Sequence, residues 1–521
     1  MLEKYFIRQK NLKDTFFIRF LRLDDENLQV FKYLCIFSGF YLASLVLANC
    51  YYIDDVGRFA NTDFNWMKDG RPLMQLMAKI IGFGKPYLDI FPVGLVLASI
   101  VFNYALVLWG RKYFGIQLPL KVSGLLALSY LNLFLLENFS YVYESLGMFL
   151  SLGIPILLYA FPDIVSSSKK FILTVFFVVL SLAFYQASIG AYIGLALIEL
   201  LYGLFQQQEQ RKILRLVGTR FLGIVVGVGV YLACIAHFLV KGYGAEHGSL
   251  IPLFTYQGCH QLLNHLSIYY QRYQTYFLSV QIVILVLVLI ILIGGSCVFL
   301  KNLYRKQELN VAAKTAYTLL IILLPALFMI CAIAPFTLLK EPVYAPRIFL
   351  SFTVFFMYLA ILLNQFDSKF YLVKFFMIPL LLFAVSFAVG YGNVLHRENL
   401  HDQYIAQSIT YDLNQLENKT GNQYKGITII GREPESLELQ KQKKKSPLMG
   451  LLVPIYMSND WYWGGRYLDH YRNVATKLLA KTPQDELSAK NRDPDITNEF
   501  YNLYANNEKA IIVFKESSRN K

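Results

Sequence analysis

Two adjacent aspartates, Asp54 and Asp55, follow the first apolar segment of the chain, and arginines come soon after them at Arg58 and Arg71. Like charges oppose the joint ionisation of neighbouring carboxylates, which can bring one of them toward the proton affinity that a general base needs. A guanidinium can keep a carboxylate ionised or bind a phosphate through its planar fork of N–H groups. The alternative is that the two aspartates only cap a short interfacial helix.

A second group of polar residues follows a later apolar segment and includes Glu137, Tyr141 and Glu144. Segment 137–145 contains no Lys or Arg, and carboxylates at a membrane edge need partners. We therefore expect a cation from the Asp54 loop, Arg58 or Arg71, to pair with them. The alternative is that these polar residues only solvate a short turn.

Three further residues could bind a substrate. Gln186, in the turn Tyr185 to Ser188, offers an amide to sugar hydroxyls, unless it only satisfies that turn. Lys340 and Arg347 are cations in an outer loop, which an anionic ligand such as a lipid phosphate would explain. The alternative for these cations is that they extend toward lipid headgroups.

The composition indicates where these groups must work. The chain has 521 residues, of which 56% are hydrophobic and only 16% charged, whereas soluble proteins have about a quarter charged residues. The mean hydropathy is +0.42, so we predict a polytopic membrane protein. The net charge of +14 arises largely in loops beside apolar segments, which favours anionic lipid over a nucleic-acid partner.

Long apolar segments predict an all-α membrane domain of about eleven transmembrane helices, because about 20 apolar residues cross the hydrocarbon core as helix. A hairpin must divide 171–204 for the loops to alternate between the two sides. The predicted spans are 32–50, 88–109, 119–136, 145–161, 171–184, 188–204, 217–240, 277–300, 316–335, 348–365 and 373–391.

Loop charge predicts the orientation, because Lys and Arg favour the cytoplasmic side. We expect a cytoplasmic basic N-terminus at 1–31, a transmembrane catalytic domain at 32–392 and an extracytoplasmic domain at 393–521. The strand-like runs 426–430 and 510–514 predict a small α/β fold for this last domain, with Lys441 to Lys445 as a solvated loop. The aromatic stretch 260–276 predicts an interfacial helix. All candidate residues then lie on the outer face of the cell membrane.

The ordered motifs on that face resemble the Gtr type II group of serotype-converting glucosyltransferases, over roughly residues 30–395. The resemblance rests on Asp54-Asp55-x-x-Arg58, Gly70-Arg71-Pro72-Leu73, Glu137-Asn138-x-Ser140-Tyr141-x-x-Glu144-Ser145, Tyr185-Gln186 and Pro346-Arg347. It implies a GT-C-like fold. It also implies transfer of a hexose, with glucose as the first choice, from a polyprenyl phosphate to a cell-envelope polysaccharide or its lipid-linked precursor.

This reaction assigns roles to the candidate residues. The enzyme must deprotonate an acceptor hydroxyl and stabilise the departing phosphate. We expect Asp54 as the base, with Asp55 as the substitute; a divalent cation, Mg²⁺ or Mn²⁺, held by this pair is the metal-assisted alternative. Donor phosphate ligands are expected at Arg58, Arg71, Lys340 and Arg347. Acceptor contacts are expected at Glu137, Tyr141, Glu144 and Gln186.

Other classes of protein would share this composition. A lipid-linked oligosaccharide flippase or another transporter is expected to carry charge within its spans or to show related halves, whereas here the conspicuous charges lie in outer loops. That difference favours an enzyme. A polysaccharide polymerase and a non-catalytic envelope assembly protein remain alternatives.

Overall fold

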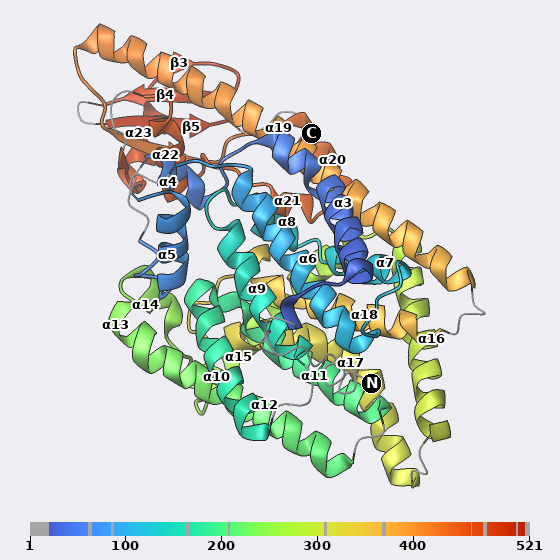
Figure 1. The fold of residues 1–521 in the computed structure, drawn as a ribbon. Helices are drawn as coiled ribbons and strands as arrows, with labels where there is room; N and C mark the ends of the chain where they lie inside the picture. Colours follow the sequence, from blue (N-terminus) through green and yellow to red (C-terminus); the bar gives the residue numbers. More distant parts are fainter. Residues whose placement is uncertain are drawn as a thin grey trace.

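The structure, a computed structural model, describes residues 20–60, 65–84, 88–161, 166–206, 209–306, 310–366, 371–459, 461–472, 477–506 and 509–515. Most of these residues form a bundle of helices, and a small domain with a sheet stands at one end of it (Figure 1). The expected fold class, a helical membrane domain followed by a small α/β tail, is confirmed in these terms.

The bundle begins with α3 (Asp25–Ala48), α4 (Asp54–Ala60), α5 (Pro72–Ile81), α6 (Val93–Tyr113), α7 (Lys121–Ala127), η1 (Leu128–Leu131), α8 (Leu135–Ser140), α9 (Ser145–Ala160), α10 (Ser167–Phe184), η2 (Gln186–Ser188) and α11 (Ile189–Phe205). It continues with α12 (Gln210–Tyr231), η3 (Leu232–Ala236), α13 (His237–Leu239), α14 (Tyr243–Gly248), α15 (Tyr256–Ser279), α16 (Ile282–Lys306), α17 (Val311–Thr337), η4 (Pro346–Phe352), α18 (Thr353–Asn364) and α19 (Tyr371–Thr420).

Within the described residues, nine helices are long and apolar enough to cross a membrane, as a multi-pass protein requires. They correspond to nine of the eleven predicted segments. The other two segments, 119–136 and 145–161, form shorter apolar helices at Lys121–Leu131 and Ser145–Ala160. The first stops before Asn132, whose side-chain amide donates to the Phe349 carbonyl oxygen and the Thr353 hydroxyl, both at 3.0 Å. The count of eleven stays a prediction.

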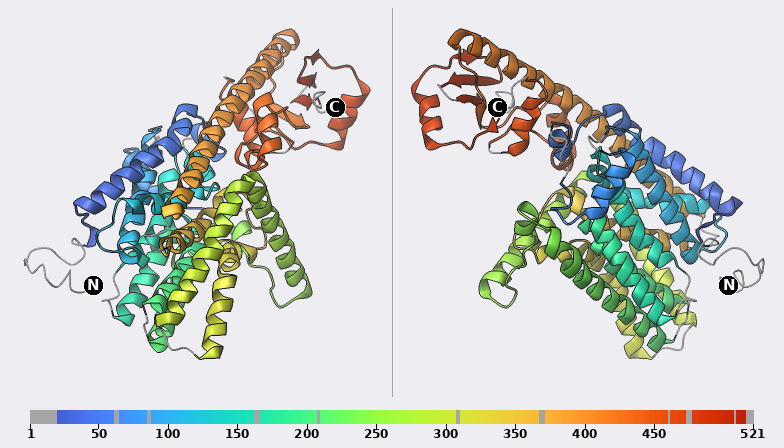
Figure 2. Two further views of the ribbon diagram at one scale, coloured as in Figure 1. Left: turned by 90° about the vertical axis from the view of Figure 1, so that its right-hand side faces the viewer. Right: turned by 60° about the vertical axis from the view of Figure 1, so that its left-hand side comes forward.

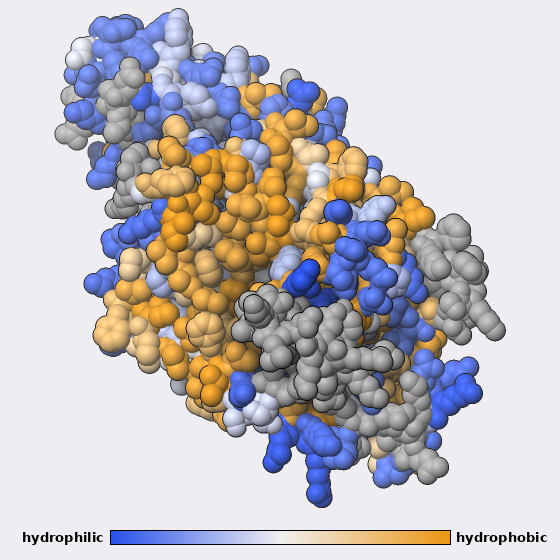
Figure 3. All heavy atoms as spheres, in the orientation of Figure 1, coloured by the Kyte–Doolittle hydropathy of each residue, from blue (hydrophilic) through white to orange (hydrophobic). Residues whose placement is uncertain are grey.

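The outer surface of the bundle is apolar. Leu47 on α3 is 79% exposed and Ile282 on α16 is 72% exposed, which would be costly in water and is expected against lipid. Figure 3 shows a broad band of apolar side chains over the middle of the helical part of this face, with hydrophilic ones over the sheet domain and along the lower edge of the bundle. The two surfaces match a bundle within a bilayer and a tail outside it.

The predicted division of 171–204 is present. Helix α10 ends before Tyr185, whose backbone is extended, and η2 then leads into α11. The hydroxyls of Ser181 and Ser188 lie 2.6 Å apart across this turn and close the hairpin. The hairpin therefore returns the chain toward the end of the bundle from which it came.

A buried ionic network joins three helices near the opposite end of the bundle. Glu199 of α11 pairs with Lys112 of α6 and with Arg220 of α12, each at 3.1 Å. These side chains are at most 3% exposed. Because buried charges are stable only when they are paired, this network fixes how the three helices meet.

Helix α19 is continuous from the membrane domain into the tail (Figure 2). Its Ala384, Ala388 and Tyr391 belong to the core of the bundle, whereas Ile409 and Leu413 belong to the core of the tail. The predicted boundary between residues 392 and 393 thus falls inside a helix, because one helix contributes an apolar face to both cores.

The tail contains a five-stranded sheet in the order β2-β1-β5-β4-β3. Its strands are β1 (Gly426–Ile430), β2 (Lys477–Leu478), β3 (Ile496–Thr497), β4 (Tyr501–Ala505) and β5 (Lys509–Phe514), and its helices are α20 (Leu437–Lys445), α21 (Met449–Leu452), α22 (Tyr462–Asp469) and α23 (Pro483–Asn491). Strand β1 pairs in parallel with β2 and β5, and β4 is antiparallel to its neighbours β3 and β5. The strand-like runs 426–430 and 510–514 are indeed β1 and most of β5.

Two expectations about helices had different outcomes. The stretch 260–276 is helical, within the longer α15. The expectation of a loop at Lys441 to Lys445 is wrong, because these residues end helix α20. The Ser436 hydroxyl caps that helix at its start, and lysines in its last turn favour the negative end of the helix dipole.

Candidate active site

Helix α4 carries three of the predicted residues, Asp54, Asp55 and Arg58. The chain leaves α3 through Asn49 at φ 43° and enters α4 through Ile53 at φ 45°. Such left-handed backbone is unfavourable for a β-branched residue, so neighbouring contacts must hold Ile53 in place. The two aspartates do start a helix, as the capping alternative required, and their side chains point in different directions from it.

Asp55 is completely buried. Its carboxylate accepts hydrogen bonds from the backbone N–H groups of Val142 at 2.7 Å, Tyr52 at 3.3 Å and Tyr143 at 3.4 Å, and Arg58 lies 3.7 Å away. Burial raises the pKa of Asp55 to about 7, while Arg58 and the Val142 amide oppose that rise. Asp55 therefore ties α4 to the segment between α8 and α9.

Asp54 has different surroundings from its neighbour. Its side chain is 26% exposed, against 0% for Asp55, and its nearest cation is Arg58 at 3.6 Å. It is also close enough to Glu137, Tyr141 and Arg347 to contribute to their electrostatic surroundings. Asp54 is thus the carboxylate of the pair that an approaching molecule can reach.

Glu144 pairs with both of the expected cations, Arg58 and Arg71. Its carboxylate pairs with Arg58, with Arg71 at 3.4 Å, and accepts a hydrogen bond from the Trp66 indole at 2.8 Å. Burial disfavours its ionisation, but Arg58 and Arg71 outweigh this and hold the pKa of Glu144 below its usual value. The predicted pairing of Glu144 with the Asp54 loop is present. The side chain is only 1% exposed and holds both arginines; its expected contact with an acceptor stays a prediction.

Gln186 links Arg71 to the turn before α5. Its carbonyl oxygen accepts from Arg71 Nε at 3.0 Å, and its amide donates to the Asp69 carbonyl oxygen and to the Tyr231 hydroxyl, both at 2.8 Å. Gly70 has φ 73°, and a Cβ there would lie 2.5 Å from the Tyr231 hydroxyl. This turn therefore needs glycine, and it presents Arg71 over the Tyr185 ring at 4.7 Å.

Arg347 pairs with Glu137, which corrects the expectation that Glu137 would pair with the Asp54 loop. The Arg347 side chain donates to Glu137 at 3.0 Å and to the Tyr141 hydroxyl at 2.7 Å, and its backbone N–H donates to Glu137 at 2.9 Å. The Asn138 amide donates to the Arg347 carbonyl oxygen at 3.1 Å. Long-range packing brings Arg347 to Glu137, whereas Arg58 and Arg71 pair with Glu144.

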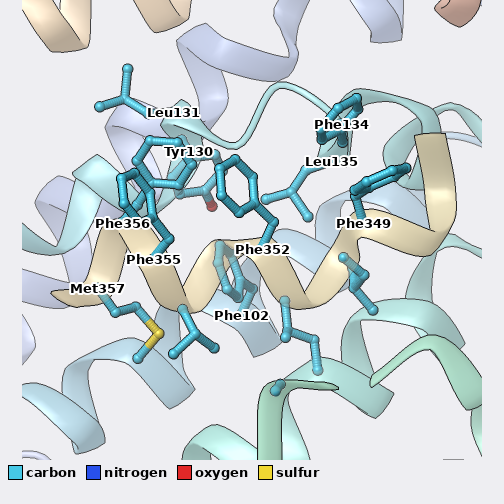
Figure 4. Packing of buried hydrophobic residues seen from close by; sticks show 14 of the residues in the cluster. Phe102, Tyr130, Leu131, Phe134, Leu135, Phe349, Phe352, Phe355, Phe356 and Met357 are labelled. Atoms are coloured by element: carbon cyan, nitrogen blue, oxygen red, sulfur yellow. The ribbon is translucent and has the colours of Figure 1, made fainter. Parts of the chain in front are cut away.

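Aromatic packing fixes the position of Arg347 at the start of η4. Phe349 stacks on Phe134 at 4.4 Å, and Phe352 lies 5.1 Å from Tyr273 of α15. Figure 4 shows Phe349, Phe352, Phe355 and Phe356 along one helical segment, with Phe134 and Tyr130 beside it. Such large rings have little freedom in a packed core, so the guanidinium before them is held firmly.

Lys340 stands apart from this cluster. Its side chain is exposed, and its backbone N–H donates to the Ser249 carbonyl oxygen at 2.7 Å. Within the described residues its side chain has no hydrogen bond or ion pair with the other candidates. Its expected role in phosphate binding stays a prediction.

The Asp pair is poorly arranged to share a cation. The Asp55 oxygens already accept backbone N–H groups and face Arg58, so Asp54 is the available oxygen ligand of the two. Across the described parts of the chain, no group of three or more His, Cys, Asp or Glu residues could hold a metal ion. The Mg²⁺ or Mn²⁺ alternative stays a prediction.

The structure adds residues that the motifs did not indicate. Trp66 lies under Arg58, whose guanidinium carbon is 5.0 Å from the ring centroid, and Tyr231 anchors the Gly70 turn through a 2.9 Å hydrogen bond to its carbonyl oxygen. Arg272 of α15 is half-buried, its Nε has no hydrogen-bond partner among the residues that the structure describes, and Glu137 lies within its electrostatic reach. The isolated cation in the aromatic stretch 260–276 was the available signal for Arg272.

Comparisons with known proteins bear on this site. The sequence profile of the family described as Glucosyl transferase GtrII matches residues 43–364, more than half of the chain and all the candidate residues. The chain is also 26% identical, over 92% of its length and 98% of the relative's, to a Salmonella phage P22 protein named "Uncharacterized 55.3 kDa protein in gtrB 5'region". No solved structure matches. The family match includes the helix with Asp54 and the segments that supply its arginines, and on this ground the chain belongs to the GtrII glucosyl transferase family and is a glycosyltransferase.

Proposed function

We propose that the protein transfers glucose from a polyprenyl-phosphate donor to a cell-envelope polysaccharide, or to its lipid-linked precursor, on the outer face of the membrane. The observation that carries the proposal is the position of Asp54. Its side chain is 26% exposed, against at most 1% for Asp55, Glu137 and Glu144, and it lies beside Arg58 and within electrostatic reach of Arg347. A base next to anchored cations is what glycosyl transfer from a phosphate requires.

The proposed reaction is a single displacement. Asp54 accepts the proton of an acceptor hydroxyl, whose oxygen forms a bond to the anomeric carbon of the donor. The bond from that carbon to the phosphate oxygen breaks, and both its electrons leave with the polyprenyl phosphate. Attack opposite to the leaving group inverts the anomeric configuration.

The arginines receive the negative charge of the leaving phosphate. Arg58, Arg71 and Arg347 are each held by a buried glutamate and are 14%, 22% and 19% exposed. Held in this way, they can donate to a phosphate without first being reorganised. We assign Glu137 and Glu144 to orienting these cations, and Tyr141 and Gln186 to the walls of the site.

Transfer of radiolabelled glucose in membranes tests the proposal. The parent is compared with Asp54→Asn and Asp55→Asn, at matched expression, with polyprenyl-phosphate glucose as donor and envelope glycan as acceptor. Asp54→Asn should lower transfer by about 10²–10⁴-fold, and the product should have the opposite anomeric configuration to the donor. Normal transfer by Asp54→Asn would overturn the assignment of the base. A parent that transports the lipid-linked sugar but transfers none would favour a flippase.

A further inference from the structure

The tail domain contacts helix α4 at its entry and along its first turn. The Tyr456 hydroxyl accepts a hydrogen bond from the Ile53 N–H at 3.1 Å and donates to the Tyr51 carbonyl oxygen at 3.1 Å. These two backbone groups flank Tyr52 and lead directly to Asp54. One tail hydroxyl therefore holds both sides of the strained entry to the helix.

Two more tail residues contact α4 further along. The His470 Nε2 lies 3.0 Å from the Val56 carbonyl oxygen; since a carbonyl only accepts, Nε2 carries the proton. A Cβ at Gly57 would lie 2.2 Å from the Trp463 ring, so the ring rests directly against the helix backbone. Val56 itself is buried in the tail core.

Helix α4 needs such support, because it has only seven residues. A helix of this length is unstable alone, and the left-handed Ile53 before it opposes its formation. Asp55 secures one side of α4 to the bundle, through Val142. The tail secures the other side.

Tyr456 is rigid enough for this task. Its ring stacks on Tyr467 at 4.7 Å and on Trp461 at 5.8 Å, with interplanar angles of 7° and 8°. The Tyr467 hydroxyl donates to the Asn399 side chain of α19 at 3.2 Å. The hydroxyl that reaches Ile53 is thus fixed through a stack of rings to the helix that joins the two domains.

We propose that Tyr456 and His470 are positioning residues for Asp54, so that the tail domain completes the active site. The inference rests on the proposed function of Asp54 and concerns a region beyond the family match, which ends at residue 364. The tail then contributes to transfer by holding the helix that carries Asp54.

The test compares Tyr456→Phe with Tyr462→Phe in the full chain, purified in detergent. The first removes the hydroxyl and keeps the ring stack. The control removes an exposed tail hydroxyl, which accepts from Arg466 at 2.7 Å. Hydrogen exchange of segment 51–60 should rise in Tyr456→Phe and stay at the parent level in Tyr462→Phe. Unchanged exchange in Tyr456→Phe would overturn the proposal, whatever the donor.

Kinetics then separate positioning from general stability. Tyr456→Phe should lower kcat by about 10²-fold, as for a misplaced catalytic group, with the donor KM unchanged. Combined with Asp54→Glu, its effect should be much smaller than in the parent, because both changes disturb the same carboxylate. Effects that simply multiply, together with a lower melting temperature, would overturn positioning in favour of a structural role. Full activity of Asp54→Asn would instead overturn the assignment of Asp54 as the base and, with it, the catalytic purpose of the positioning; raised exchange in Tyr456→Phe would then show only that the tail holds α4.

Discussion

At the scale of single residues, two neighbouring aspartates differ in burial and in their contacts. Asp55 is buried and accepts three backbone N–H groups, whereas Asp54 faces the arginines and remains reachable. The difference arises because successive side chains of a helix with 3.6 residues per turn point about 100° apart, so that one turns inward and the other stays at the surface. Under the proposed function, adjacent residues of one type thus serve as an anchor and as the base.

The anchor should give the enzyme a pH dependence. The pKa of Asp55 is about 7, so its carboxyl gains a proton below that pH and loses charge, together with its attraction for Arg58. Transfer should therefore fall as the pH drops from 8 to 6, with an apparent pKa of about 7. A pH profile of transfer tests this. Asp55→Asn, which cannot ionise, should have low activity at every pH, without the decrease between pH 8 and 6. If that decrease persists in this variant, it arises from the ionisation of another group.

Arg347 and Lys340 should differ in their effects on the donor. Arg347→Lys keeps the charge but replaces the planar guanidinium, whose Nη1 donates to both Glu137 and the Tyr141 hydroxyl. We expect donor binding to weaken by about 1.5–3 kcal/mol, as for a lost hydrogen bond to a charged group. Donor titration of initial rates measures this, with Lys340→Ala as the exposed control. If Lys340→Ala weakened donor binding more than Arg347→Lys, Lys340 and not Arg347 would be the main phosphate ligand.

At the scale of elements, the turn before α5 depends on one glycine. Gly70→Ala should destabilise the turn by about 1–3 kcal/mol because of its positive φ, and the methyl group would also displace the Tyr231 hydroxyl. Arg71 should lose its position, and transfer should fall. Gly84→Ala is the matched control, since Gly84 has φ 115° but open space around it. Equal losses of transfer in both variants would show that contact with Tyr231 is unimportant.

The ionic network far from the site should affect stability and leave the chemistry intact. Glu199→Gln removes the buried carboxylate charge that pairs with both Lys112 and Arg220, which should cost about 3–5 kcal/mol. Thermal unfolding in detergent measures the loss. The folded fraction should keep the parent's donor KM, because no residue of this network is among those around Asp54. A changed KM would reveal coupling across the bundle.

The sequence predicted the features of the fold and of the site that depend on a single segment of the chain. Apolar length predicted the long helices, and the runs 426–430 and 510–514 predicted β1 and most of β5. The need of Glu144 for a cation predicted its pairing with Arg58 and Arg71. Local sequence patterns hold no information on partners that are distant in the chain. Glu137 pairs with Arg347 because η4 packs beside α8. The Tyr456 hydroxyl contacts Ile53 although some 400 residues separate them in the sequence.

At the scale of the whole molecule, orientation remains a prediction that labelling can test. After replacement of the exposed Cys234, Cys259 and Cys297, single cysteines are placed at Asn459 in the tail and at Lys212 in the first turn of α12. An impermeant maleimide should label Cys at 459 in intact cells and Cys at 212 only after permeabilisation. Labelling of both from one side would overturn the orientation and move the proposed site away from the outer face.

The uninterrupted α19 also determines how far above the membrane the protein extends. A helix of 50 residues is about 75 Å long at 1.5 Å per residue, and it is packed on α3 below and on the sheet above. The tail cannot tilt or rise without bending that helix. If the acceptor is anchored in lipid, only sugar units at one fixed distance from the membrane would reach Asp54. Units nearer to the membrane or farther from it would stay unmodified.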